Sequence, residues 1–216
     1  MFTSASNFSN NVDAVFLYIA GLSLIVLIGI TVAMIYFVIR YSRKRNPVPT
    51  HVEENLTLEI LWTGIPLVLF ISMFYFGWVG YTDMRAIPVD AMQIKVTARM
   101  WQWSFEYPNG LKTDTLYVPV SKAVRIDLHS NDVSHAFFVP AFRIKKDVYP
   151  NKKNDVWFQS EKVGRYDIAC AEYCGLKHSG MYSAVYIMEK NDFEQWYNKT
   201  SAKAGLKPFL VTEVKN

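Results

Sequence analysis

Two long runs of apolar residues dominate the first part of the chain. Ala14–Ile39 and Ile60–Thr82 contain no charged side chain. A helix needs roughly 20 predominantly apolar residues to cross the hydrocarbon core of a bilayer, and both runs are long enough. Two buried helices of a soluble domain are the alternative, but helices of this length would then show a polar face. We therefore predict a transmembrane hairpin over residues 1–82, with helices at about 14–39 and 60–82 and a connecting loop at 40–59.

The charge pattern orients this predicted hairpin. Arg40 and the run Arg43–Arg45 lie between the two helices, whereas Asp13 and Asp83 at the opposite helix ends have no basic cluster beside them. Lys and Arg in short loops mark the cytoplasmic side of a membrane. A cleavable secretory signal would be shorter and would follow basic residues, so we predict a retained first helix. Both termini, and everything after Asp83, are then expected outside the cytoplasm.

After residue 83 the apolar residues alternate with polar ones. Val124, Ile126 and Leu128 alternate with polar side chains, which is typical of a half-buried strand. Similar patterns predict strands at Gln93–Ala98, Trp101–Tyr107, Asp155–Ser160, Arg165–Cys170 and Met181–Met188. Short strands separated by turn signals predict an all-β sandwich or barrel over residues 83–216. A short helix ends it, at roughly Asp192–Ala204, with Asn191 as its expected cap.

One segment of the β region combines several side chains that bind metals. Cys170, Cys174, His178 and Met181 follow one another at short spacing, and His135 lies on an earlier segment. Thiolate, imidazole and thioether groups together favour copper, and a Cys–His–Met loop with a remote His is the usual pattern of a single-copper electron-transfer site. That pattern uses one thiolate, so the second cysteine is surplus to it.

The surplus Cys170 leaves several interpretations open. Two thiolates that both bridge a pair of metals would use both cysteines, with Met181 and a loop carbonyl, most simply that of Glu172, in the weaker positions. Such a pair can share one electron, which suits fast electron transfer. A disulfide is the alternative in an oxidising compartment, although a four-residue separation is awkward for it. A zinc site is disfavoured because methionine is a poor zinc ligand.

Three further features have ordinary interpretations. Trp101 and Trp103 are expected on one face of a strand, where core packing is the usual role. Glu59 lies at the cytoplasmic end of the second helix, where most ionisable residues are interfacial. Residues 83–216 contain 19 Lys and Arg against 15 Asp and Glu, so the predicted exterior domain carries a net charge of +4.

Four segments, in the right order, resemble subunit II of the haem–copper cytochrome oxidases. The string C-x-E-x-C-G-x-x-H-x-x-M over residues 170–181 resembles the loop that holds the family's dinuclear copper centre, called CuA. Asp132-Val-Ser-His135 resembles the segment of the first histidine ligand. The strings W-Q-W-S-F-E-Y at 101–107 and L-E-I-L-W-T-G-I-P at 58–66 resemble the aromatic strand and the start of the second membrane helix.

This resemblance implies a cupredoxin-like Greek-key β-barrel behind the hairpin, and it implies roles by position. Trp101 would receive electrons from a cytochrome c, and Glu59 would lie at the mouth of a proton path in the catalytic haem–copper subunit, where oxygen is reduced. The Glu172 carboxylate would face a magnesium ion shared with that subunit. The CuA ligands would be the Glu172 backbone carbonyl and the side chains of His135, Cys170, Cys174, His178 and Met181.

The resemblance also sets expectations about partners. No C-x-x-C-H motif is present, so the electron donor would be a separate protein, and Asn151 replaces a glycine usual in the family. The net charge of +4 would steer an acidic or neutral donor more favourably than a strongly basic one. The lipid bilayer of a bacterial inner membrane and other oxidase subunits are further expected partners, and nucleic acid is not one.

Three alternative functions share parts of this pattern. A quinol oxidase subunit II has the same fold without copper and would lack the ligands that are present here. Nitrous oxide reductase shares the copper loop but is soluble, which the two predicted membrane helices contradict. A membrane-anchored copper-delivery or thiol-exchange protein would need an exposed, exchangeable metal.

Overall fold

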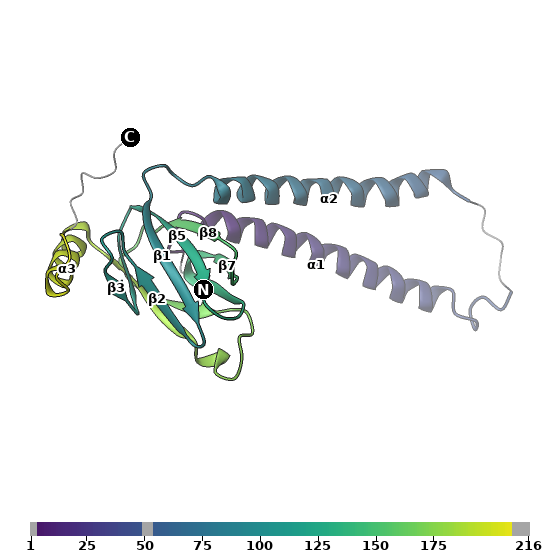
Figure 1. The fold of residues 1–216 in the computed structure, drawn as a ribbon. Coiled ribbons are helices and arrows are strands. Elements are labelled where there is room, and N and C mark those ends of the chain that lie inside the picture. The colour runs from purple at the N-terminus through teal and green to yellow at the C-terminus, as the bar shows by residue number, and fades with distance from the viewer. Residues whose placement is uncertain (1–3, 49–53, 209–216) are drawn as a thin grey trace. The chain divides into compact units, whose positions relative to one another are not determined.

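The computed structural model describes residues 4–48 and 54–208. The middle of the predicted loop 40–59 and the last eight residues of the chain therefore lie outside the described residues. The chain divides into two compact units (Figure 1). One is helical and covers Asn11–Tyr81; the other contains the β-strands and groups the start of the chain, up to Asn10, with everything from Thr82 onward.

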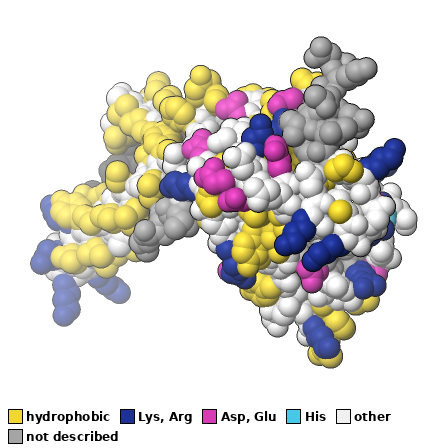
Figure 2. Space-filling view, turned by 90° about the vertical axis from the view of Figure 1, so that its left-hand side faces the viewer, with side chains coloured by type: hydrophobic (Ala, Val, Ile, Leu, Met, Phe, Trp, Pro, Cys, Tyr) yellow, Lys and Arg dark blue, Asp and Glu magenta, His cyan; other side chains and the backbone are white. Residues whose placement is uncertain are grey.

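The helical unit consists of two long helices, α1 (Ser9–Arg40) and α2 (Leu56–Arg85). They contact each other where the Tyr18 hydroxyl lies 2.7 Å from Ser72 Oγ. Most of their large apolar side chains are exposed, as the yellow surface in Figure 2 shows. Both helices are long and apolar enough to cross a membrane, and a bilayer would cover these side chains.

Both helices extend beyond the apolar runs that predicted them. At the start of α2 the Asn55 side chain accepts a hydrogen bond from the Leu58 backbone N–H, at 3.2 Å, so a helix cap adds a turn before Ile60. At the other end the helix continues through Asp83 to Arg85. Hydropathy marks only the part of a helix suited to the hydrocarbon, because polar end turns belong to the interface.

The β unit is a sandwich of two five-stranded sheets. The first has the order β3-β2-β1-β5-β8 and the second the order β4-β10-β9-β6-β7. The first sheet contains β1 (Met92–Arg99), β2 (Gln102–Glu106), β3 (Lys112–Thr113), β5 (Ala123–Ser130) and β8 (Asn154–Gln159). The second contains β4 (Leu116–Pro119), β6 (His135–Val139), β7 (Ile144–Val148), β9 (Gly164–Cys170) and β10 (Tyr182–Met188).

The core lies between the sheets and follows the alternation in the sequence. On β1 the side chains of Ile94, Val96 and Ala98 are fully buried, whereas Lys95 is exposed. The predicted order of two apolar helices, an all-β region and a short helix is confirmed. Four strands were not predicted (β3, β4, β6 and β7), since they are short or lack alternation. On β6, for example, three successive residues from His135 are buried.

The C-terminal helix α3 (Lys190–Lys203) begins before its predicted start. The prediction that Asn191 caps it is wrong, because Asn191 lies within the helix and Glu189 precedes it without a side-chain capping bond among the described residues. One face of α3 is apolar and packed: Phe193 and Tyr197 are buried, and the Tyr197 ring packs edge-on against Tyr107 at 5.4 Å.

The residues just before α1 belong to the β unit, which the sequence pattern did not predict. Ser160 Oγ donates a hydrogen bond to the Ala5 carbonyl at 2.8 Å, and Ser6 Oγ donates one to the Phe142 carbonyl at 2.8 Å. The Phe8 ring packs edge-on against Trp157 at 4.8 Å. Polar bonds from small serines, rather than a run of apolar residues, hold this segment in place.

Candidate metal centre

The metal-binding side chains come from neighbouring parts of the second sheet. Cys170 ends β9, and the loop 171–181 then leads into β10. Strand β6 pairs with β9 so that Phe137 lies opposite Cys170, which places His135, at the start of β6, beside the loop. The loop is tied back to the sheet, because the Cys170 N–H donates to the Met181 carbonyl at 3.1 Å.

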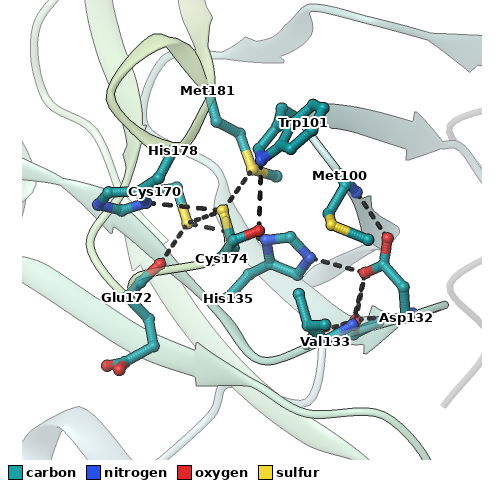
Figure 3. A network of polar contacts seen from close by, with 11 residues as sticks. Met100, Trp101, Asp132, Val133, His135, Cys170, Glu172, Cys174, His178 and Met181 are labelled. Carbon is teal, nitrogen blue, oxygen red and sulfur yellow. Dashed lines mark hydrogen bonds and ion pairs between the residues drawn. The ribbon is translucent and has the colours of Figure 1, made fainter. Parts of the chain in front are cut away.

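The two cysteine sulfurs lie at the centre of the cluster (Figure 3), with Cys170 Sγ 3.8 Å from Cys174 Sγ. Each sulfur has an imidazole beside it: His135 Nδ1 is 3.8 Å from Cys170 Sγ, and His178 Nδ1 is 3.5 Å from Cys174 Sγ. The ligand atoms of His135, Cys170 and Cys174 lie within 4.8 Å of one another. Two thiols and two imidazoles therefore converge on one point.

Two weaker donors complete the cluster. Met181 Sδ lies 3.8 Å from Cys174 Sγ, and the Glu172 backbone carbonyl oxygen lies 3.2 Å from Cys170 Sγ. His135 and Met181 are fully buried, and Cys174 is only 3% exposed. The structure thus brings together all six of the predicted ligand groups in a site that is largely shielded from water.

The chemistry of this donor set separates the candidate interpretations. The described cysteines are free thiols, and their 3.8 Å separation is far from the roughly 2.05 Å of a disulfide bond. A structural zinc ion takes four ligands, so the two cysteines and two histidines would leave the buried Met181 thioether unused. Thiolate, thioether and imidazole donors together favour copper.

Burial disfavours the ionised form of the Cys174 thiol. Burial, followed by the nearby Cys170 sulfur, raises the pKa of the Cys174 thiol to about 11. The thiol is therefore protonated at neutral pH when no metal is present. Metal binding needs the thiolate, so loading this site must release protons.

Asp132 supports the cluster from behind His135. Its Oδ1 lies 2.9 Å from His135 Nε2, and its Oδ2 accepts a hydrogen bond from the Met100 backbone N–H at 2.7 Å. Burial alone would raise the pKa of the Asp132 carboxyl, but the bonds from His135 and from the Met100 and Val133 backbone N–H groups lower it. The sequence pattern did not identify Asp132 as a site residue. Its position three residues before His135, a candidate ligand, is the signal that could have indicated this contact.

Trp101 lies beside the cluster but not where the strand pattern placed it. Strands β1 and β2 pair through Arg99 and Gln102, so Met100 and Trp101 form the turn between them. The expectation that Trp101 and Trp103 share a strand face is therefore wrong: Trp103 is a buried core residue, whereas Trp101 is half-buried. The Trp101 indole N–H donates to the Cys174 carbonyl at 3.2 Å.

The Trp101 ring also packs closely on the metal-binding loop. Gly175 has a φ of +112°, and a Cβ at this position would lie 3.5 Å from the Trp101 ring. The backbone angle favours glycine here, whereas 3.5 Å is an ordinary contact distance. The Lys177 ammonium, from the same loop, lies 5.7 Å from the centre of the ring.

The two glutamates occupy different environments. The Glu172 carbonyl faces the cysteines, while its carboxylate points away from them (Figure 3) and is exposed. The pKa of the nearby Tyr149 hydroxyl is raised by its hydrogen bond to Asp147 and, to a smaller extent, by Glu172. Glu59 lies in the first turn of α2, in the helical unit, and is also exposed.

Comparisons with known proteins identify related sequences and structures. Residues 1–77 match the family described as cytochrome c oxidase subunit II, transmembrane domain, and residues 110–188 match its periplasmic domain. A probable cytochrome c oxidase subunit 2 from Rickettsia conorii is 31% identical over 219 residues, covering 86% of this chain and 69% of the relative.

Two solved structures resemble the β unit. The periplasmic domain of cytochrome oxidase subunit II from Bradyrhizobium japonicum is 31% identical, with a TM-score of 0.53 over 55% of this chain and 99% of that domain. The second structure is a mixed disulfide between a thioredoxin-like protein and a cytochrome c oxidase subunit II. Its matched chain is 30% identical to this chain, with a TM-score of 0.50 over 55% of this chain and 96% of the matched chain. The predicted cupredoxin-like fold is thereby confirmed, and the chain belongs to the cytochrome c oxidase subunit II family.

Proposed function

We propose that this chain is the electron-accepting subunit of a terminal respiratory oxidase. It would take single electrons from a cytochrome c at a dinuclear copper centre and pass them to a haem-containing catalytic subunit, where oxygen is reduced and protons are translocated. The observation that carries this proposal is the convergence of two thiols, two imidazoles, one thioether and one carbonyl oxygen in a buried cluster. A copper-free quinol oxidase subunit would have no use for that set.

Six groups would hold the two coppers. Copper bound in this way would take up and release one electron while sharing it between both ions. Paired strands position His135 and Cys170, and a short 3₁₀ turn positions His178. Full burial of Met181 helps to keep water from the site. Besides Met181, the groups are the Glu172 carbonyl and the side chains of His135, Cys170, Cys174 and His178.

Trp101 is the proposed point at which electrons arrive. Its ring is half-buried, so one part meets solvent while the indole N–H bonds to the Cys174 carbonyl. This single hydrogen bond leads from the protein surface to a residue of the donor cluster. Among the tryptophans that the structure describes, Trp101 alone donates a hydrogen bond to a cluster residue; Trp103 meets His135 only by an edge-on ring contact at 6.2 Å.

The remaining roles also belong to the proposal. The exposed Glu172 carboxylate would face a magnesium ion shared with the catalytic subunit, and Glu59 would lie at the mouth of that subunit's proton path. The two apolar helices would span a bacterial inner membrane, with both termini and the β unit on the periplasmic side. Carboxylate oxygen is a ligand that magnesium prefers, and the exposed apolar surface of the helices suits a bilayer.

Electron paramagnetic resonance of the full chain, purified in detergent and loaded with copper, tests the copper assignment. One unpaired electron shared equally by two copper nuclei gives a seven-line hyperfine pattern, which is the expected result. A four-line pattern would show a single copper and would contradict the dinuclear centre. Copper analysis of the same sample should give two ions for each chain.

The surface around Trp101 indicates the kind of donor that can dock. Leu176 and Tyr173 are 88% and 76% exposed, and the Lys177 ammonium lies over the Trp101 ring. Residues 83–216 have a net charge of +4, and the face of the β unit visible in Figure 2 mixes both signs of charge. We propose a donor cytochrome that is not strongly basic and that docks through apolar contacts.

Replacing Lys177 by Glu should increase the rate at which a basic cytochrome c reduces the centre. The change removes a repelling charge beside Trp101 and adds an attracting one, and steering effects of on the order of tenfold are ordinary at low salt. The gain should shrink as salt screens the charges. Stopped-flow rates at several ionic strengths measure both effects.

The matched control is Lys199→Glu, which makes the same charge change at an exposed position on α3. It should have a much smaller effect, since it lies outside the loop that contacts Trp101. A wild-type chain whose reduction by a basic cytochrome c already falls steeply with salt would contradict the proposed donor.

A further inference from the structure

One carboxylate connects two parts of the candidate site that are far apart in the sequence. Asp132 Oδ1 lies 2.9 Å from His135 Nε2, while Oδ2 of the same carboxylate accepts from the Met100 N–H at 2.7 Å. Met100 precedes Trp101 in the turn between β1 and β2. The carboxylate thus contacts both the back of a candidate copper ligand and the turn that carries the candidate electron acceptor (Figure 3).

The contacts of this carboxylate determine where His135 carries its proton. An ionised carboxylate can only accept hydrogen bonds, and Oδ1 already accepts one from the Val133 N–H at 2.7 Å. His135 Nε2 must therefore be the protonated nitrogen. Nδ1 is then left with a free lone pair on the side of the ring that faces Cys170 Sγ, at 3.8 Å. This is the tautomer that a metal ligand needs.

We propose that Asp132 is a positioning residue that holds His135 in its Nε2-protonated form and fixes the Met100–Trp101 turn against the same ligand. The inference rests on the proposed function of the cluster as a copper centre. Ligand histidines commonly donate their second N–H to a carboxylate, which fixes the ring and raises its basicity. Here the same carboxylate also holds the turn beside it, so one side chain aligns the acceptor residue with the cluster.

Asparagine at this position would retain the shape but not the chemistry. Its amide oxygen can accept hydrogen bonds, but its nitrogen only donates. In one orientation the nitrogen would face the Met100 N–H; in the other it would face His135 and favour protonation at Nδ1. Asp132→Asn therefore cannot keep both the Met100 contact and a His135 protonated at Nε2, and the side chain is only 24% exposed, so water replaces a lost contact poorly.

The tautomer can be read directly in the metal-free protein. The chain has four histidines, and long-range proton–nitrogen NMR of the full chain, labelled at histidine and held in detergent, shows which nitrogen of each carries hydrogen. Wild-type His135 should be protonated at Nε2. Asp132→Asn should shift it toward Nδ1, or lose the protected Nε2–H signal.

The same variant, loaded with copper, provides a second test through its copper affinity, its spectrum and its rate of electron uptake. Losing such a partner typically costs about 10- to 100-fold in metal affinity or activity, so Asp132→Asn should bind copper that much more weakly and change the hyperfine splitting. Electron uptake should fall by a similar factor with basic and with acidic donors alike. The control is Asp167→Asn, which removes the same charge from an exposed carboxylate paired with Arg165.

Two results would overturn the proposal. One is a wild-type His135 protonated at Nδ1, which needs no variant and so remains decisive if Asp132→Asn does not fold. The other is an Asp132→Asn chain that matches Asp167→Asn in the His135 tautomer, the copper affinity and the copper spectrum. A change in the salt dependence of electron uptake alone would show only a surface-charge role for Asp132. A wild-type chain without the seven-line spectrum would instead refute the copper centre itself.

Discussion

Replacing Cys174 by Ser is expected to abolish the seven-line copper spectrum and leave at most a four-line one. The serine hydroxyl is nearly the size of the thiol but does not ionise near neutral pH, so it cannot supply the second bridging thiolate. Electron uptake from a cytochrome c should fall by more than the roughly 10- to 100-fold typical of losing an outer-shell partner. Spectra of the copper-loaded chain and stopped-flow reduction rates measure these two effects.

The folded β unit should tolerate this change, which separates a lost ligand from a lost fold. Thermal unfolding of the metal-free chain should be similar in the wild type and in Cys174→Ser. Ser179→Ala, at an exposed position of the same loop, is the matched control and should retain the wild-type spectrum. A Cys174→Ser chain that still shows seven lines would contradict a centre bridged by both cysteines.

Replacing Trp101 by Phe is expected to slow electron uptake while leaving the copper spectrum unchanged. Phenylalanine retains an aromatic ring in the turn but loses the indole N–H that donates to the Cys174 carbonyl. If that bond carries the electron, its loss weakens the electronic coupling between the surface and the cluster, and the reduction rate should fall on the order of tenfold or more. Single-turnover reduction by cytochrome c measures the rate.

Trp196→Phe provides the comparison, since Trp196 is also half-buried but lies on α3, against Tyr117 at 4.2 Å. Its reduction rate should match that of the wild type. If Trp101→Phe altered the hyperfine pattern, the tryptophan would be a support for the loop and not an electron acceptor. An unchanged rate would exclude the electron-acceptor role.

Features that depend on neighbouring residues could be predicted from the sequence. The membrane helices follow from uninterrupted apolar runs, and strands such as β5 follow from alternation. The candidate metal-binding loop is equally local: Cys170, Cys174, His178 and Met181 lie within twelve residues, so their types and spacing alone indicated a metal site. The ends of the helices and the cap of α3 were predicted less well, because caps depend on single hydrogen bonds that side-chain preference predicts poorly.

Features that depend on distant pairings could not be predicted. Strand β6 was not predicted, although it carries His135, because its inward and outward positions do not alternate. Trp101 was placed on a strand when it forms a turn, since only the pairing of Arg99 with Gln102 shows where β1 ends and β2 begins. The segment around Ser6 gave no apolar signal, because serine hydroxyls bonded to carbonyls hold it in the β unit.

The sequence by itself determined the family resemblance, the two-helix anchor and the identity of the six candidate ligand groups. The tertiary structure decided how those groups meet, since the pairing of β6 with β9 places His135 beside Cys170. It also decided that Asp132 and Trp101 belong to the same site. Residue types follow from local chemistry, but distances between segments remote in the chain depend on strand pairing and core packing, which the whole domain determines together.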